Sequence, residues 1–418
     1  MNIVERFIGY TEINTTTDRV KGAQGIMPSS PGQMVLAQQL ARELEQLGLI
    51  DVQVADTAIV TATLPANIEH EAPTVAFFAH LDTSAEQSNA TRAQIKRHEK
   101  DAICLNEALG IYLRESEFPE LAAYRGQEIL VTDGTSLLGA DDKAAIAAIM
   151  DSLQYFQANP DQQHGTVKVA FLPDEEQGLR GDQSRFDVQA FNADFGFTLD
   201  CCGIGEFVCE NWNAGDVVVT FTGQSAHPMS AKGKLKNSLL MAHKFIAMLP
   251  AGEAPEYTEG REGYYWVKEL KGNSAKTVLN LDVRDFTQQG YQQRMDFLQS
   301  LAESCQQLWG GVEIKLSNRY ENVANSLQDD RFGILEIAKQ AYLRNGIEMK
   351  SIPMRGGYDG AVLSQKGLPC PNLFTGAHNF HSIYEYLPVQ SLYSASAVVQ
   401  EIIRLTSEKP LNHGENAL

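Results

Sequence analysis

The chain has 418 residues and a formal net charge of −19, so it is long enough for two or three domains and too acidic for non-specific binding to nucleic acid or to an anionic membrane. Its hydrophobic content of 43% is that of an ordinary globular protein, and no stretch reaches the roughly 20 apolar residues of a membrane span. The six cysteines form no paired CxxC motif, and the amphipathic N-terminus is unlike a signal peptide. We therefore expect free thiols and a cytoplasmic protein.

Strand-like and helix-like segments alternate through the first half of the chain. Residues 73–80 ("PTVAFFAH") predict a buried strand that ends in a histidine, and residues 143–156 have the apolar spacing of a helix. Residues 166–176 predict a strand that runs into acidic residues, and residues 193–200 predict another strand with an aspartate at its end. This alternation predicts an α/β fold with a mixed, mostly parallel sheet covered by helices. Residues 86–125 stand apart, because they are charged and favour helix.

The pattern changes near residue 213. Two strands, at 216–223 and 312–320, enclose a helix, a hairpin and a second helix, at 238–249, 264–286 and 290–308. This β-α-β-β-α-β order is that of a ferredoxin-like α+β unit. Helix–strand alternation then returns and ends in a helix at 388–405.

These elements predict two domains. Residues 1–212 and 323–418 would form one discontinuous α/β domain. Residues 213–322 would form an inserted ferredoxin-like domain.

Polar residues collect where the predicted strands end, or in similar loops. In open α/β sheets, ligands bind beyond the carboxyl ends of the strands. The residues at these places are His80, Asp82, Asp141, Glu175, Glu176, Asp200 and, late in the chain, His381. Two histidines and several carboxylates are a suitable ligand set for two divalent metal ions, and mixed imidazole and carboxylate donors favour zinc.

The spacing of these residues suggests which of them bind metal, which orient a ligand and which accept a proton. His80 and Asp82 face the same way in an extended segment, so the carboxylate can orient the imidazole. Of Glu175 and Glu176, one can reach a metal while the other takes a proton from a water molecule. Asp141 could bridge two ions with its two oxygens. Each residue also has a simpler explanation, such as a helix cap or a solvated acidic turn.

The order of the motifs resembles one known family. The segments "AHLDTS", "LLGADDKA", "LPDEE", "TLDCCGIGEFVCEN", "SAHP", "VRDF", "RGGYDGA" and "GLPCPNLFTGAHNFH" occur in the order found in a family of di-zinc hydrolases. That family contains aminotripeptidases, succinyl-diaminopimelate desuccinylase and glutamate carboxypeptidase. The chain is most similar to its aminotripeptidase branch, and the similarity extends over nearly the whole sequence.

The resemblance implies a role for each metal ligand. His80 and Asp200 would bind one of two zinc ions per subunit. Glu176 and His381 would bind the other, and Asp141 would bridge them. The family also has a cis peptide bond after the bridging aspartate.

The resemblance also implies the residues that act on the substrate. Glu175 would be the general base, and Asp82 would orient the first ligand histidine. His227 would be the lid histidine that stabilises the oxyanion, which often comes from the other subunit of a dimer. Arg284 and Arg355 would hold the substrate near its carboxylate. Taken singly, the histidine could be a turn residue and the arginines could form structural ion pairs.

The implied activity is that of a metal-dependent aminopeptidase that removes the N-terminal residue from short peptides, foremost tripeptides. A zinc-activated bridging water would attack, with a glutamate as base, and the inserted domain would serve as a lid and a homodimer interface. Three alternatives keep the scaffold: a carboxypeptidase, an N-acyl amino acid hydrolase, and a peptide-binding protein without catalysis.

Some positions differ from the family pattern. Cys201 and Cys202 stand where glycines usually follow the aspartate ligand, and "HNFHSIYEY" stands where the aminotripeptidases typically read "YNYHGKHEF". These changes bear on substrate length and side-chain preference. Lys143 is expected to be a surface residue or a local partner of Asp142.

Overall fold

The computed structural model describes residues 1–88, 92–177 and 185–409. The chain divides into two compact units. Unit 1 comprises Met1–Cys209, Ser326–Ile352 and Tyr358–Leu418, and unit 2 comprises Glu210–Asn325 and Pro353–Gly357. Among the described residues, no helix combines the length and apolar character needed to cross a membrane. All six cysteines are free thiols, as predicted.

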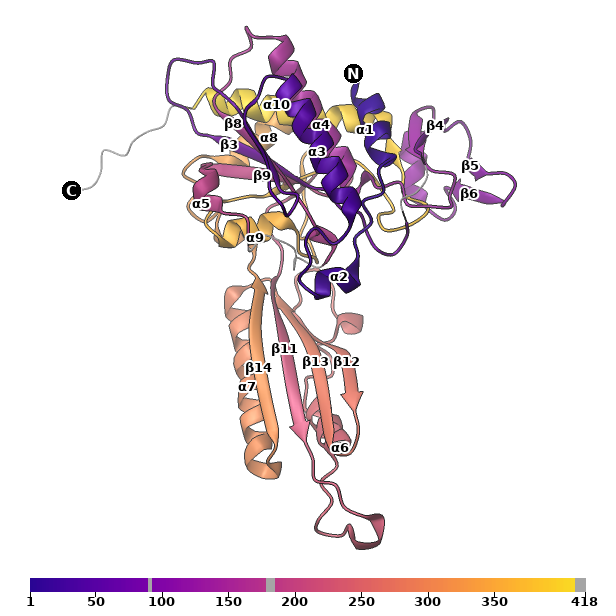
Figure 1. The fold of residues 1–418 in the computed structure, drawn as a ribbon, viewed down its shortest axis with the longest axis vertical. Coiled ribbons are helices and arrows are strands. Elements are labelled where there is room, and N and C mark those ends of the chain that lie inside the picture. Colours follow the sequence, from indigo (N-terminus) through magenta and orange to yellow (C-terminus); the bar gives the residue numbers. More distant parts are fainter. Residues whose placement is uncertain (89–91, 178–184, 410–418) are drawn as a thin grey trace, which may run out of the picture. The chain divides into compact units, whose positions relative to one another are not determined.

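Unit 1 is built on an eight-stranded mixed sheet (Figure 1). Its strands, in spatial order, are β1 (Ile50–Val54), β2 (Val60–Leu64), β8 (Val167–Leu172), β3 (Val75–His80), β9 (Phe195–Leu199), β16 (Asn372–Leu373), β10 (Glu206–Val208) and β15 (Lys350–Ser351). The central strands β8, β3, β9 and β16 run parallel. Every residue of β3 and β9 is buried, as expected for parallel strands that are covered on both faces.

Helices cover both faces of this sheet. Their bounds are α1 (Ile3–Thr11), α2 (Arg19–Ala23), α3 (Pro31–Gln46), α4 (Ala140–Ala158), α5 (Val188–Phe191), α8 (Ile334–Arg344), α9 (Asp359–Gln365) and α10 (Val389–Ser407). Helix α4 packs against β3, α1 and α10. On the other face, Ala76 and Phe78 of β3 join a core cluster with Val188 of α5 and Leu363 of α9. The predicted α/β architecture of a mixed sheet between helices is therefore confirmed.

Two small antiparallel sheets complete unit 1. One consists of β4 (Gln94–Arg97), β7 (Glu128–Val131) and β17 (Leu387–Pro388), and the other of β5 (Ala102–Asn106) and β6 (Ile111–Arg114). The helix preference expected for residues 86–125 is thus wrong over most of the described part. Ile103, Leu105 and Leu113 are buried in a cluster with Tyr386, so tertiary packing of alternating apolar residues overrides local propensity.

Unit 2 is a four-stranded antiparallel sheet with two helices. In chain order its elements are β11 (Asn213–Thr222), α6 (Ser238–Ala247), β12 (Tyr264–Gly272), β13 (Lys276–Asp285), α7 (Gln288–Trp309) and β14 (Val312–Tyr320), and the sheet order is β12-β13-β11-β14. Alternate residues of β11, among them Val217 and Val219, pack with Phe245 of α6 and Leu298 of α7. This is the predicted ferredoxin-like arrangement.

Candidate metal centre

Adjacent strands bring the predicted ligands to one edge of the unit 1 sheet. His80 is the last residue of β3, and Asp200 directly follows β9. Glu175 and Glu176 lie in a short 3-10 turn after β8. Because β8, β3 and β9 are parallel neighbours, their carboxyl ends meet at the same edge.

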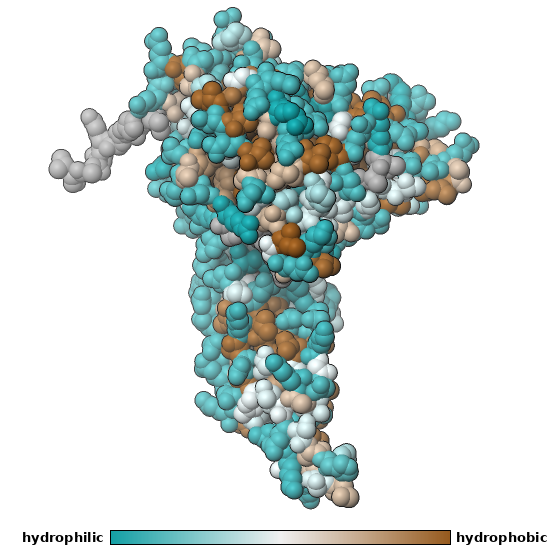
Figure 2. All heavy atoms as spheres, in the orientation of Figure 1, coloured by the Kyte–Doolittle hydropathy of each residue, from teal (hydrophilic) through white to brown (hydrophobic). Residues whose placement is uncertain are grey.

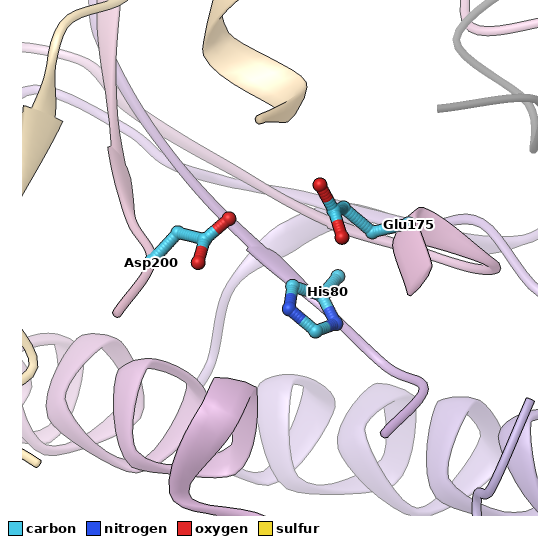
Figure 3. A group of neighbouring side chains, drawn as sticks. All are labelled: His80, Glu175 and Asp200. Atoms are coloured by element: carbon cyan, nitrogen blue, oxygen red, sulfur yellow. The ribbon is translucent and has the colours of Figure 1, made fainter. Parts of the chain in front are cut away.

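His80, Glu175 and Asp200 form the first group that could hold a metal ion. One ligand atom from each lies within 4.8 Å of the other two. Figure 3 shows both carboxylates and the imidazole directed into a common space. Glu175, predicted to be the base, is thus close enough to act as a ligand as well.

Asp141 connects this group to a second one. Its Oδ1 lies 2.9 Å from Nε2 of His80, and its Oδ2 lies 3.3 Å from Nε2 of His381. The same His381 nitrogen lies 2.7 Å from Oε1 of Glu176. Asp141, Glu176 and His381 therefore form the second potential metal group, and Asp141 faces the imidazoles of both. The peptide bond between Asp141 and Asp142 is cis, as the family resemblance predicts.

Asp142 belongs to a third group, with His80 and Asp141, that the sequence analysis did not assign. Its Oδ2 accepts a hydrogen bond of 3.0 Å from the backbone N–H of His80. Its Oδ1 is buried and has no hydrogen-bond partner among the described residues. The only sequence signal was its position next to Asp141. We call His80, Asp141, Asp142, Glu175, Glu176, Asp200 and His381 the ligand cluster.

Lys143 differs from the expectation of a surface residue or a partner of Asp142. Its side chain is fully buried, and its Nζ donates a hydrogen bond of 2.7 Å to the backbone oxygen of Ile13. Burial lowers the pKa of Lys143 to about 7. The residue ties the start of α4 to the chain that follows α1.

Asp82 contacts three residues of the ligand cluster. Nδ1 of His80 lies 3.0 Å from the backbone oxygen of Asp82 and 3.3 Å from its Oδ1, so the main chain and the carboxylate of this residue both orient the imidazole. The two carboxylate oxygens of Asp82 also accept hydrogen bonds from the backbone N–H groups of Glu175, at 3.0 Å, and Glu176, at 3.1 Å. The same carboxylate therefore holds both the imidazole and the acidic turn, a second task that the sequence did not reveal.

Charges in the ligand cluster shift one another's protonation. Burial, with a further contribution from the charge of Asp141, raises the pKa of Asp200 to about 7. Hydrogen bonds to Asp141 and then to Glu176 raise the pKa of His381 to about 11. Burial alone would raise the pKa of Asp141, but hydrogen bonds from His381 and His80 outweigh it and hold this pKa below its ordinary value. These buried carboxylates therefore need bound cations to balance their negative charge.

The donor set fits divalent metal ions. Five carboxylates and two imidazoles converge in the ligand cluster, and most of them are buried. Buried charges in proteins are paired or coordinate metals, and one oxygen of Asp142 lacks a partner among the described residues. Imidazole and carboxylate donors are those of zinc and related ions.

The two predicted substrate arginines lie in unit 2. Arg284 pairs with the buried Asp282, whose oxygens lie 3.3 Å from Nε and 3.0 Å from Nη2. Arg355 donates to the backbone oxygens of Thr258 and Gly260, and its guanidinium lies 4.8 Å from the ring centroid of Trp212. Arg284 therefore forms a structural ion pair, the alternative named above, whereas Arg355 is held by backbone oxygens and an aromatic ring.

His227 is also in unit 2. It is exposed and precedes a short 3-10 turn, where its Nδ1 accepts a hydrogen bond of 3.2 Å from the N–H of Met229. This contact matches the alternative of a turn histidine and leaves Nε2 for other partners. Its role toward a substrate stays a prediction.

A comparison with known protein families shows which family the chain belongs to. The sequence model described as "Peptidase family M20/M25/M40" matches residues 136–405. The chain belongs to this family. Members of peptidase family M20 include solved structures with the same fold, among them a dinuclear metal-binding peptidase from Bacillus subtilis with a TM-score of 0.66 and 15% identity over 97% of this chain and 98% of that one.

Individual relatives are more similar still. Peptidase T of Bacillus licheniformis is 41% identical over 411 residues, which cover 97% of this chain and 99% of the relative. Peptidase T of Bacillus subtilis (strain 168) is 41% identical over 96% of this chain and 98% of the relative. The crystal structure of aminopeptidase PepT from Bacillus cereus superposes with a TM-score of 0.76, at 21% identity, over 98% of both chains. The predicted resemblance is therefore confirmed, and this member of the M20 family is a metallopeptidase.

Proposed function

We propose that this metallopeptidase removes the N-terminal residue from short peptides, foremost tripeptides. The observation that carries the chemistry is the convergence of the two metal groups, joined by Asp141, at one sheet edge. The substrate class is supported by the 41% identity to bacterial peptidase T over nearly the whole of both chains.

Two divalent ions, with zinc as the metal, would occupy the ligand cluster. His80 and Asp200 would bind one, and Glu176 and His381 the other. Asp141 would bridge them, which fits its position between the two imidazoles. When bound, the ions supply a Lewis acid for the scissile carbonyl and lower the pKa of the attacking water.

Glu175 would act as the general base. Burial, followed by the charge of Asp200, raises the pKa of Glu175 well above its ordinary value, so the carboxylate can accept and hold a proton. The proton would pass from the attacking water to Glu175 and then to the leaving amine. Asp82 would keep the base in place through its hydrogen bond to the Glu175 N–H.

Unit 2 would contribute substrate binding as a lid domain. Arg284 and Arg355 would hold the peptide carboxylate, and His227 would stabilise the oxyanion that forms at the scissile carbonyl. Both guanidinium groups already have partners within unit 2, Arg284 with Asp282 and Arg355 with Thr258 and Gly260, so the substrate carboxylate would add to these contacts or replace them. A clamp on the carboxylate would favour short peptides.

Unit 2 would also form a homodimer interface. Strand β12 is an edge of the four-stranded sheet, and Trp266, Val267 and Leu270 on it are 42%, 37% and 43% exposed. Figure 2 shows apolar side chains gathered over part of the strands of unit 2. Exposed apolar edge strands are prone to pair with another chain. The free thiols favour a cytoplasmic location for the dimer.

Peptide assays test the proposed activity directly. The zinc-loaded protein is expected to cleave Ala-Ala-Ala into alanine and Ala-Ala, and to leave N-acetyl-Ala-Ala-Ala intact. Cleavage of the blocked peptide from its C-terminal end would identify a carboxypeptidase, and hydrolysis of N-acetyl or N-succinyl amino acids would identify an acyl hydrolase. Binding of the tripeptide without hydrolysis would indicate a protein without catalysis.

A further inference from the structure

Glu385 is a buried carboxylate that joins two metal-ligand segments of unit 1. It lies four residues after His381, and it is 1% exposed. Its Oε2 accepts a hydrogen bond of 2.7 Å from the N–H of Gly139, and its Oε1 accepts one of 3.0 Å from the N–H of Asp141. The segment that carries His381 is therefore fastened to the start of α4, where Asp141 lies.

The two bonds hold the irregular first turn of α4. The residue before α4 is Gly139, which has a φ of 75° and offers no capping side chain, and the first turn is irregular because Asp141 and Asp142 have non-helical φ and ψ angles. Helix N-termini carry unpaired N–H groups and favour negative charge. Here the acceptor comes from a residue more than 240 positions away, and both of its oxygens are used.

An ionised carboxylate suits this place because it only accepts hydrogen bonds. An amide could accept from one of the two N–H groups but would direct its own NH₂ toward the other. Asp141 contacts Nε2 of His381 at 3.3 Å, so a small rotation of the backbone at Asp141 would part these two groups. The bonds to Glu385 oppose that rotation.

We propose that Glu385 is a positioning residue of the metal centre. It fixes the backbone of Asp141 relative to the segment of His381, so that both side chains face the same ion. The inference rests on the proposed function, in which Asp141 and His381 are metal ligands. Supporting groups of this kind set metal affinity, and their loss typically weakens it about 10–100-fold.

Asp330 offers a matched control in the same unit. Its carboxylate accepts hydrogen bonds from the N–H groups of Ile334, at 2.6 Å, and Leu335, at 3.1 Å, at the start of α8. Like Glu385, Asp330 uses both oxygens at the start of a helix, but it is half-buried, bonds within its own segment and contributes to none of the three potential metal groups. Loss of either carboxylate should lower stability, and only the loss of Glu385 should weaken metal binding.

The experiment compares full-length wild type, Glu385→Gln and Asp330→Asn. Each protein is freed of metal with a chelator, its Tm is measured, and its Zn²⁺ affinity is determined by competition with a chromophoric chelator. We expect Glu385→Gln to bind Zn²⁺ about 10–100-fold more weakly than wild type, and Asp330→Asn to bind as wild type does. If Glu385→Gln is too unstable to purify, Glu385→Asp, which keeps the charge but shortens the side chain, is expected to weaken binding in the same way.

Wild-type affinity in both Glu385 variants would overturn the inference, as would an equal loss in Asp330→Asn, which would reveal a general effect of instability. Failure of the wild-type protein itself to bind Zn²⁺ would be a different result. It would overturn the proposed metal centre, and the role of Glu385 would fall with it.

Discussion

The charged residues of unit 2 and those of the ligand cluster in unit 1 are arranged in opposite ways. In unit 2, arginines and aspartates pair within the fold, as in Arg294 with Asp285 and Arg319 with Asp216. In unit 1, the ligand cluster gathers five carboxylates around two imidazoles. Charges that are already paired need nothing more, whereas a buried surplus of carboxylates calls for cations from outside the chain. Metal dependence should therefore be a property of unit 1 alone.

Removal of Asp141, the carboxylate shared by the two metal groups, should have the largest effect on the ligand cluster. We expect Asp141→Ala to lower kcat/KM for Ala-Ala-Ala by about 10⁴-fold or more, because the chemistry supplied by bound metal is worth several kcal/mol. Zinc content, measured by atomic emission, should fall below two ions per chain. The control is Asp216→Asn in unit 2, which removes one of the two ion pairs of Arg319 and should lower Tm while two zinc ions remain bound. Full zinc content and activity in Asp141→Ala would contradict the assignment.

Substitution of the base separates chemistry from metal binding. Glu175→Gln should lower kcat by about 10²–10⁴-fold, the usual contribution of a general base, while zinc content stays at that of wild type. Because Glu175 also lies within reach of a metal position with His80 and Asp200, the zinc content is decisive. Loss of one zinc ion together with activity would make Glu175 a ligand instead.

The substrate clamp should produce a smaller and more selective effect. Arg284→Ala should lower kcat/KM for Ala-Ala-Ala about 10–100-fold, mainly through KM, because hydrogen bonds to a charged group are worth about 1.5–3 kcal/mol. The tripeptide amide, which lacks the carboxylate, should show little change between wild type and variant. An equal loss for acid and amide would mean that Arg284 acts on the fold and not on the substrate.

Proton release should accompany metal binding to unit 1. At pH 7 without metal, His381 with a pKa of about 11 holds a proton, and Asp200 with a pKa of about 7 is partly protonated. Metal ligands must be deprotonated, so Zn²⁺ affinity should rise with pH, by about tenfold per unit for each proton released. Calorimetry in buffers of different ionisation enthalpy measures the number released. Binding without proton release would contradict the assignment of these two residues as ligands.

The sequence predicted the parts of the fold that follow from periodicity. The buried strand ending in His80 and the β-α-β-β-α-β order of unit 2 are both observed, because apolar spacing reflects which faces are covered. Residues 102–114 looked helical but form β5 and β6, since their packing in the core cluster with Tyr386 has no local signal.

The same limit applies to the candidate site. Residues at strand ends, such as His80 and Asp200, could be singled out from sequence because chain direction places them at one edge. The contacts that support these residues could not be predicted from the sequence. Asp82 holds a backbone more than 90 residues away, and Glu385 holds Gly139 from a still greater distance, so only the folded chain reveals them.

Anomalous diffraction from crystals of the zinc-loaded protein decides where the ions bind. We predict two zinc peaks in unit 1, one bound by His80 and Asp200, the other by Glu176 and His381, with Asp141 between them. A single peak, or peaks at residues outside the ligand cluster, would contradict the proposed two-metal centre.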